Sequence, residues 1–299
     1  MRSPFALDGA PAERDPDWTV RLGPAVEVNG PPDGRQLGRL SLGDWHYWSA
    51  AEDENGTARR WITHHGRTAR TEFDLPGRAI TMRPDPRADA GIMPLLFAGS
   101  GLAHALAADG HGSMHASAVE VGGRAIAFIG HPGKGKSTLA ALLCAAGARS
   151  ISDDLLRCEI EGDRAFCHRG GSRIRLRPQA AALADDLDDA EATADERTSA
   201  RAEPTPHERI ELAALVVPDP SRERRRIEVT RLRGRHAAQE LLRAPRLLGW
   251  IDPDLATRHL DLCRELAARV PVLVASCPWG PPFPEDMAAE LTRILLAEG

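Results

Sequence analysis

The chain has 299 residues, 42% of them hydrophobic, so it can bury the core of one large domain or of two smaller ones. Its net charge of −5 is mild and argues against a protein held to nucleic acid or to an anionic membrane mainly by bulk charge. The five cysteines are scattered and lack CxxC spacing, which favours free or buried thiols in a reducing, cytoplasmic compartment over a disulfide framework or a zinc site.

The N-terminal part of the chain is rich in proline, glycine and charge, and its first fifteen residues contain no apolar export segment. We expect residues 1–40 to form a loose lead into a small β-containing region. Its candidate strands are Thr19–Val28, His46–Ser49 and Arg60–His64. Pro84 and Pro86 end this region and predict a small N-terminal part of residues 1–88, followed by a domain of residues 89–299.

No charged residue lies between Asp89 and Asp109, a length that could span a bilayer. The segment consists largely of alanine and glycine, contains Pro94 and His104, and has no basic flank. These features predict a buried helix at about residues 90–108 and no membrane partner.

The next segment has the layout of a nucleotide-binding α/β core. Ser117–Val121 and Arg124–Ile129 are typical of buried strands joined by a glycine turn. A glycine-rich loop follows, then an apolar helix at Lys136–Ala146 that Gly147 ends. Arg149–Ser152 is a further expected strand, which leads into two aspartates. Strand, loop, helix and acid-terminated strand predict an α/β fold with a P-loop core.

The rest of the chain alternates between expected strands and helices. A hairpin is expected at Arg157–Ile160 and Arg164–His168, strands at Ile210–Val217, Ile227–Leu232 and Val272–Ala275, and helices at about 236–244, 254–268 and 284–297. Residues 185–208 are rich in Asp, Ala and Thr, which predicts a mobile surface loop that orders over a bound acceptor or is an insertion without a role.

The loop matches the pattern GxxxxGK[ST] from Gly130 to Ser137. Its glycines let backbone N–H groups point at a phosphate, Lys136 would neutralise β- and γ-oxygens, and the Ser137 hydroxyl can ligate Mg²⁺. A plain glycine turn is the alternative, which the flanking strand and helix disfavour. The expected nucleotide-binding residues are Gly130, Pro132, Gly133, Lys134, Gly135, Lys136, Ser137 and Thr138.

Lysine usage supports this interpretation. Of 38 basic residues only Lys134 and Lys136 are lysines, and both lie in the loop. A slim ammonium reaches a phosphate where a broad guanidinium does not fit.

The acid pair Asp153 and Asp154 ends the expected strand. One acid would support Mg²⁺ and the other would accept a proton from an attacking hydroxyl. An N-cap for a short helix is the alternative for the pair taken alone.

Three segments together resemble the catalytic domain of HPr serine kinase/phosphorylase. They are HASAV from His115, GHPGKGKST from Gly130 and GARSISDD from Gly147. The likeness covers about residues 111–160 and is stronger to stand-alone HPr-kinase-like proteins, some of which modify peptides in biosynthetic clusters such as those for lasso peptides. The segment CHRGGSRIR from Cys167 departs from the family's EIRGLG-like segment, so phosphorylase activity and HPr as substrate are not implied.

The resemblance implies a role for each matching residue. Ser137 and Asp154 would support Mg²⁺, Asp153 would be the base, Lys136 would contact the phosphoryl oxygens, and His115 would orient the acid pair. Which aspartate has which role stays open.

The sequence thus predicts a kinase that uses ATP or GTP with Mg²⁺ and transfers the γ-phosphoryl group to a serine hydroxyl of a peptide or protein. A kinase of a small hydroxylated metabolite and a non-catalytic nucleotide-dependent switch are the alternatives. No nucleic-acid partner is expected, and a homo-oligomer is compatible with the sequence.

Overall fold

The computed structural model describes residues 3–5, 17–43, 45–247, 249 and 251–298. Its contacts divide the chain into an N-terminal unit, Met1–Gly110 with Leu247–Arg258, and a second unit, His111–Arg246 with His259–Gly299. The loose lead expected over residues 1–40 lies partly outside the described residues. Most of the first fifteen residues, expected to contain no export segment, also lie outside them. Within the described part, this lead contains two strands.

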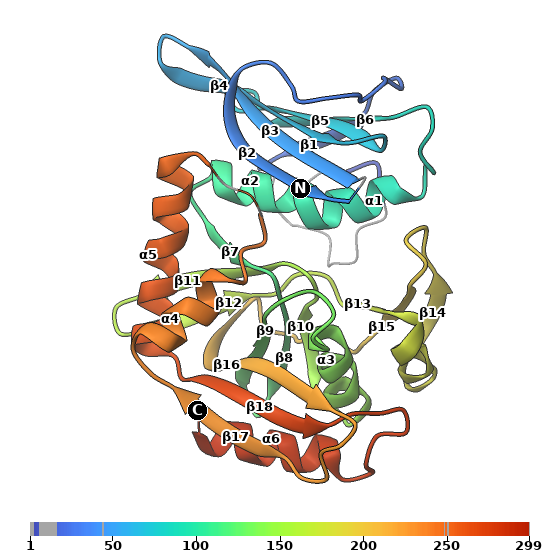
Figure 1. Ribbon diagram of the computed structural model, residues 1–299, viewed down its shortest axis with the longest axis vertical. Coiled ribbons are helices and arrows are strands. Elements are labelled where there is room, and N and C mark those ends of the chain that lie inside the picture. Colours follow the sequence, from blue (N-terminus) through green and yellow to red (C-terminus); the bar gives the residue numbers. More distant parts are fainter. Residues whose placement is uncertain (1–2, 6–16, 44, 248, 250, 299) are drawn as a thin grey trace. The chain divides into compact units, whose positions relative to one another are not determined.

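The N-terminal unit contains a six-stranded sheet in the order β1-β6-β5-β4-β3-β2, shown in blue to cyan in Figure 1. All neighbours pair antiparallel except β1 and β6, which are parallel. The strands are β1 (Thr19–Leu22), β2 (Arg35–Leu42), β3 (Trp45–Glu54), β4 (Thr57–His65), β5 (Ala69–Asp74) and β6 (Ala79–Pro84). The expected strands His46–Ser49 and Arg60–His64 fall within β3 and β4, whereas Thr19–Val28 coincides with β1 only as far as Leu22.

The helix expected at 90–108 consists of α1 (Ile92–Leu96), a π-helical segment η1 (Phe97–Gly101) and α2 (Leu102–Ala108). Its buried side, with Met93 and Phe97, shares one apolar core with the six-stranded sheet. This packing places the segment in the N-terminal unit, so the boundary expected near residue 88 differs from the division at Gly110. Among the described residues, no helix combines the length and apolarity that crossing a bilayer requires.

The second unit is built on a nine-stranded sheet in which β10-β8-β9-β16-β12-β11-β7 form one path and β18 joins β17 to β16. β9 and β18 run parallel to β16, and the other pairs are antiparallel. The strands are β7 (Gly112–Met114), β8 (Ala116–Val121), β9 (Arg124–Ile129), β10 (Arg149–Ser152), β11 (Leu156–Glu161), β12 (Arg164–His168), β16 (Arg209–Ser221), β17 (Glu228–Leu232) and β18 (Val272–Pro278).

Helices cover both faces of this sheet, so its central strands are apolar on both sides. In β9, Ile126 and Phe128 belong to one core with α3 (Lys136–Ala145) and α6 (Met287–Glu298). Alternate residues of β9, ending with Ile129, belong to a second core with α4 (Arg235–Leu242) and α5 (Pro253–Arg269). The mixed α/β class expected from the sequence is therefore confirmed.

The acid-terminated strand β10 is not a direct neighbour of β9, the strand that precedes the loop. β10 pairs with β8 rather than with β9, so β8 lies between the strand before the loop and the strand before the acids. This order brings the start of β8 into the region between the loop and the acid pair, and with it His115 and Ser117.

The segment 185–208, expected to be a surface loop, is largely exposed but contains the end of a 3₁₀ helix and two strands. β13 (Arg173–Leu176), β15 (Thr198–Arg201) and β14 (Asp188–Ala192) form a three-stranded sheet, and the 3₁₀ helix η2 (Pro178–Asp186) lies between β13 and β14 in the chain. Ala200 is fully buried together with Ile174 and Leu176. Alanine side chains provide much of the packing of this sheet. Because the segment has few large apolar residues, its composition resembles that of a loop.

All five cysteines are free thiols. Burial raises the pKa of each, to about 12 for Cys167 and Cys263 and to about 11 for Cys277. Near neutral pH they are therefore protonated, and they behave as small apolar side chains.

Candidate functional site

The glycine-rich loop connects β9 to α3, as the sequence predicts. Gly130, Gly133 and Gly135 have φ values of 123°, 84° and 89°, a region that side chains with a Cβ rarely adopt. Gly135 is the N-cap of α3. The first turn of α3 therefore presents free backbone N–H groups and the positive end of the helix dipole, which together favour an anion.

Lys136 lies inside the site, with only 6% of its surface exposed. Its Nζ donates to the carbonyl oxygens of Gly130 at 2.9 Å and His131 at 3.2 Å. Burial lowers the pKa of Lys136 to about 8, against the opposing charges of the acid pair. Lys134, in contrast, is exposed and does not line the cleft, so the two lysines of the loop are not equivalent.

Asp153 is the acid that contacts the loop. Its Oδ1 accepts hydrogen bonds from Ser137 Oγ at 2.8 Å and from Ser117 Oγ at 2.6 Å, and its Oδ2 accepts one from the Arg175 backbone N–H at 3.0 Å. The two serine hydroxyl oxygens are 3.4 Å apart. Ser137 Oγ and Asp153 Oδ1 thus form a pair of oxygens at the N-terminus of α3.

Asp154 faces away from the loop serine and toward cations. Its Oδ2 accepts hydrogen bonds from Arg246 at 2.8 Å and Arg175 at 3.1 Å, and its Oδ1 lies 3.4 Å from His115 Nδ1. Burial raises the pKa of the Asp154 carboxyl, but Arg246, His115 and Arg175 together hold it below its ordinary value. Asp154 also has φ +71°, a conformation that Asp and Asn tolerate better than other residues with a Cβ.

His115 lies half-buried just before β8. Burial lowers its pKa to about 4, against the attraction of Asp154 and with the added effect of the positive charges on Lys136 and Arg246. The imidazole is therefore neutral near pH 7, and it can donate one hydrogen bond and accept another.

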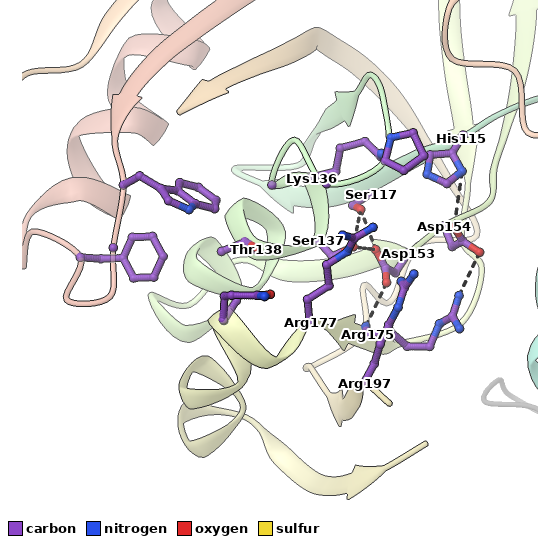
Figure 2. A pocket seen from close by; sticks show the side chains of 18 residues that line it. His115, Ser117, Lys136, Ser137, Thr138, Asp153, Asp154, Arg175, Arg177 and Arg197 are labelled. Atoms are coloured by element: carbon purple, nitrogen blue, oxygen red, sulfur yellow. Dashed lines mark hydrogen bonds and ion pairs between the residues drawn. The ribbon is translucent and has the colours of Figure 1, made fainter. Parts of the chain in front are cut away.

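These side chains line one cleft of about 410 Å³, within the size range of small-molecule sites. In Figure 2, Lys136 and Ser137 lie between Thr138 on one side and His115 with Asp154 on the other. Of the expected residues, Gly130 and Lys134 lie outside the cleft lining, whereas the others line it: His115, Pro132, Gly133, Gly135, Lys136, Ser137, Thr138, Asp153 and Asp154.

Several lining residues were not expected from the sequence. Ser117 had a usable signal, because it lies two residues after His115 along a strand and so shares its face. Arg175 lies in β13, Arg177 precedes η2 and Arg197 precedes β15. Arg246, which follows α4, contacts Asp154 without lining the cleft. These arginines are far from the loop in sequence. Because 36 of the chain's 38 basic residues are arginines, no local pattern distinguished them from the others.

The lining also includes an aromatic pair, Trp279 and Phe283, in the chain that follows β18. Among the described residues, no cluster of three or more His, Cys, Asp or Glu side chains could hold a metal ion alone. A metal bound beside Ser137 and Asp153 would need further ligands from a substrate or from water.

Comparisons with known proteins add little to what the geometry of the site shows. No family model matches the chain, and no curated protein matches it. Among solved structures, a match is the Hpr(Ser) kinase/phosphatase from Coxiella burnetii, at 12% sequence identity and a TM-score of 0.32. It covers 62% of this chain and 99% of that one.

Proposed function

We propose that this protein is a kinase that binds ATP or GTP with Mg²⁺ and transfers the γ-phosphoryl group to a hydroxyl, in first place a serine of a peptide or protein. The observation that supports it most is the convergence of Lys136, Ser137 and two aspartates in one cleft at the N-terminus of α3. The resemblance of residues 111–160 to stand-alone HPr-kinase-like proteins points to the same reaction.

The loop would hold the phosphates. Three glycines with positive φ and the free N–H groups of α3 suit a polyphosphate, and Lys136 supplies a cation already held at the loop. Its ammonium would exchange the carbonyl oxygens of Gly130 and His131 for phosphoryl oxygens. Because the charge on the transferring group is spread over those oxygens, positioned cations are the main source of rate.

Ser137 and Asp153 fit a Mg²⁺ ion. Neighbouring oxygen ligands of an octahedral Mg²⁺ at 2.0–2.1 Å lie about 2.9 Å apart, and Ser137 Oγ lies 2.8 Å from Asp153 Oδ1. A site with one hydroxyl and one carboxylate matches the preference of Mg²⁺ for few protein ligands completed by substrate phosphates and water. Bound there, the ion would neutralise charge on the phosphates.

This geometry favours one assignment of the acid pair, with Asp153 beside the metal and Asp154 beside the acceptor. The Asp154 carboxylate faces Arg175, Arg246 and His115 rather than Ser137. The arginines keep it ionised, which makes it a weak proton acceptor. That suffices for a loose phosphoryl transition state, in which the hydroxyl loses its proton late.

His115 would position Asp154 and the incoming hydroxyl. If Nδ1 carries the proton of the neutral ring, it points at Asp154 Oδ1 and helps to hold that acid in place. Arg177 and Arg197 line the same cleft and would stabilise negative charge on the transferring group.

The test is to incubate the protein with γ-labelled ATP, Mg²⁺ and two acceptor sets, serine-containing peptides and small hydroxylated metabolites, and to locate the label by mass spectrometry. We expect the label on a peptide serine with wild type and none with Lys136→Ala. Label on metabolites alone would move the acceptor class, and nucleotide binding without transfer to either set would favour a switch over a kinase.

A further inference from the structure

The chain after β18 places two aromatic rings in an otherwise polar cleft. Trp279 and Phe283 meet edge to face, with ring centroids 5.5 Å apart and an interplanar angle of 86°. Both are half-buried and pack against the apolar core of α6 and β18. A Cβ on Gly280 would lie 2.7 Å from the Phe283 nitrogen and 2.8 Å from Phe283 Cγ, so only glycine lets the chain turn back here.

The indole lies directly against the glycine-rich loop. A Cβ on Gly135 would lie 2.4 Å from Trp279 Cη2 and 3.0 Å from Cζ3, so the benzo edge of the ring contacts the N-cap of α3. Trp279 therefore contacts the residue next to Lys136, at the end of the helix that would hold the phosphates.

The aromatic pair and the acid pair lie at different ends of the cleft. In Figure 2 the chain after β18, drawn in faint red, passes on the Thr138 side of the loop, away from His115 and Asp154. The cleft thus has an ionic end, where Asp154 meets its arginines, and an apolar end lined by Trp279 and Phe283. Phosphates held between these ends must direct the γ-phosphoryl group toward the acids, which leaves the apolar end for the nucleoside.

We infer that Trp279, supported by Phe283, is the base subsite of the cleft and stacks the purine ring of the nucleotide. This inference rests on the proposed function, because it assumes that the loop holds the phosphates. Stacking needs a large planar face and no particular pattern of hydrogen bonds, which an indole fixed by a neighbouring ring provides. Purines present more ring area than pyrimidines, so they fit this surface best.

The experiment compares two ligands that share the polyphosphate but differ in the base. Affinities for ATP and for inorganic tripolyphosphate, each with Mg²⁺, are measured by titration calorimetry on wild type, Trp279→Ala, Trp279→Phe and Lys136→Ala. Phe166→Ala is the matched control, because it removes an aromatic ring of the same unit that does not line the cleft.

We expect Trp279→Ala to weaken ATP binding about 5- to 100-fold, the usual effect of removing one stacking partner. Tripolyphosphate binding should stay as in wild type, and Trp279→Phe should recover most of the ATP affinity. Equal losses for both ligands would overturn the inference, since the indole would then only support Gly135. Unchanged ATP affinity in Trp279→Ala would overturn it as well.

The base subsite and the kinase reaction can fail separately. Loss of ATP selectivity in Trp279→Ala without transfer to any hydroxyl would leave the subsite standing and remove the kinase. Phosphoryl transfer that requires Lys136 but is unchanged in Trp279→Ala would support the kinase and remove the base subsite. Lys136→Ala should weaken ATP and tripolyphosphate alike, because its charge contacts only what the two ligands share.

Discussion

Replacing Asp153 with asparagine separates the metal-supporting acid from its neighbour. The carboxylate accepts two serine hydroxyls on Oδ1 and the Arg175 N–H on Oδ2. An asparagine oxygen in the Oδ2 position keeps the bond to the Arg175 N–H, and its NH₂ group faces hydroxyls that can turn to accept. The fold should therefore survive, with a loss of at most about 1–2 kcal/mol.

The same substitution should remove the Mg²⁺ site. The asparagine NH₂ group replaces the Asp153 Oδ1 lone pairs with hydrogens that point toward Ser137 Oγ. The substitution also removes the only negative charge among the two proposed ligands. Lost ligands or supporting groups lower metal affinity about 10- to 100-fold or more. We expect the Mg²⁺ concentration that half-saturates ATP binding to rise by that factor, while binding measured without Mg²⁺ stays near that of wild type.

Asp154→Asn is the matched variant, because asparagine tolerates φ +71° and has the same shape. It should leave the Mg²⁺ dependence unchanged and lower single-turnover transfer about 10- to 100-fold, at the low end for a positioned base since the proton leaves late. Calorimetry across a Mg²⁺ series and quenched-flow transfer measure the two effects. If Asp154→Asn raises the Mg²⁺ requirement and Asp153→Asn does not, the roles revert to those that the resemblance implies; if neither variant changes anything, the acid pair is structural.

Three further outcomes follow from particular contacts. Lys136→Arg should bind nucleotide as poorly as Lys136→Ala, because the loop carbonyls at 2.9 and 3.2 Å enclose the ammonium and leave no room for a guanidinium. An active Lys136→Arg enzyme would contradict the importance of the slim lysine side chain. Gly135→Ala should destabilise the second unit by at least about 1–2 kcal/mol in chemical denaturation, because φ is +89° and the new Cβ would lie 2.4 Å from Trp279; wild-type stability would refute that packing. Asp85→Asn should destabilise the N-terminal unit by about 1–3 kcal/mol, since the buried carboxylate accepts the Val28 N–H and pairs with Arg87. Arg87 holds the pKa of Asp85 well below its ordinary value against the opposing effect of burial, so this contribution is complete above about pH 4 and is lost as the pH falls further; an Asp85→Asn variant with the same acid unfolding profile as wild type would refute it.

The local part of the site could be predicted from the sequence, because its signals lie in neighbouring residues. The strand before the loop, the helix after it and the acids at the end of β10 are each encoded within about ten residues, and the structure has them at the expected positions. The pairing of β10 with β8 could not be predicted this way, since strand order depends on contacts distant in sequence.

Regions that pack with small or polar residues were the ones missed. β5 buries Ala69 and Thr71 beside Phe73, a weaker apolar pattern than that of β9. The three-stranded sheet packs through Ala200, whose burial no composition reveals. Arg246 contacts Asp154, 92 residues away in the chain, and Trp279 lies beside Gly135; both contacts exist only through the tertiary fold.

The most direct measurement follows the γ-phosphoryl group through a single turnover, with the protein in excess over labelled ATP and a serine-containing peptide identified in the acceptor screen. We expect the label to move from ATP to the peptide hydroxyl and this transfer to require Mg²⁺. Lys136→Ala should abolish the transfer while the fold is retained. ATP that binds in the cleft and keeps its γ-phosphoryl group, or label that reaches only water, would contradict the proposed kinase.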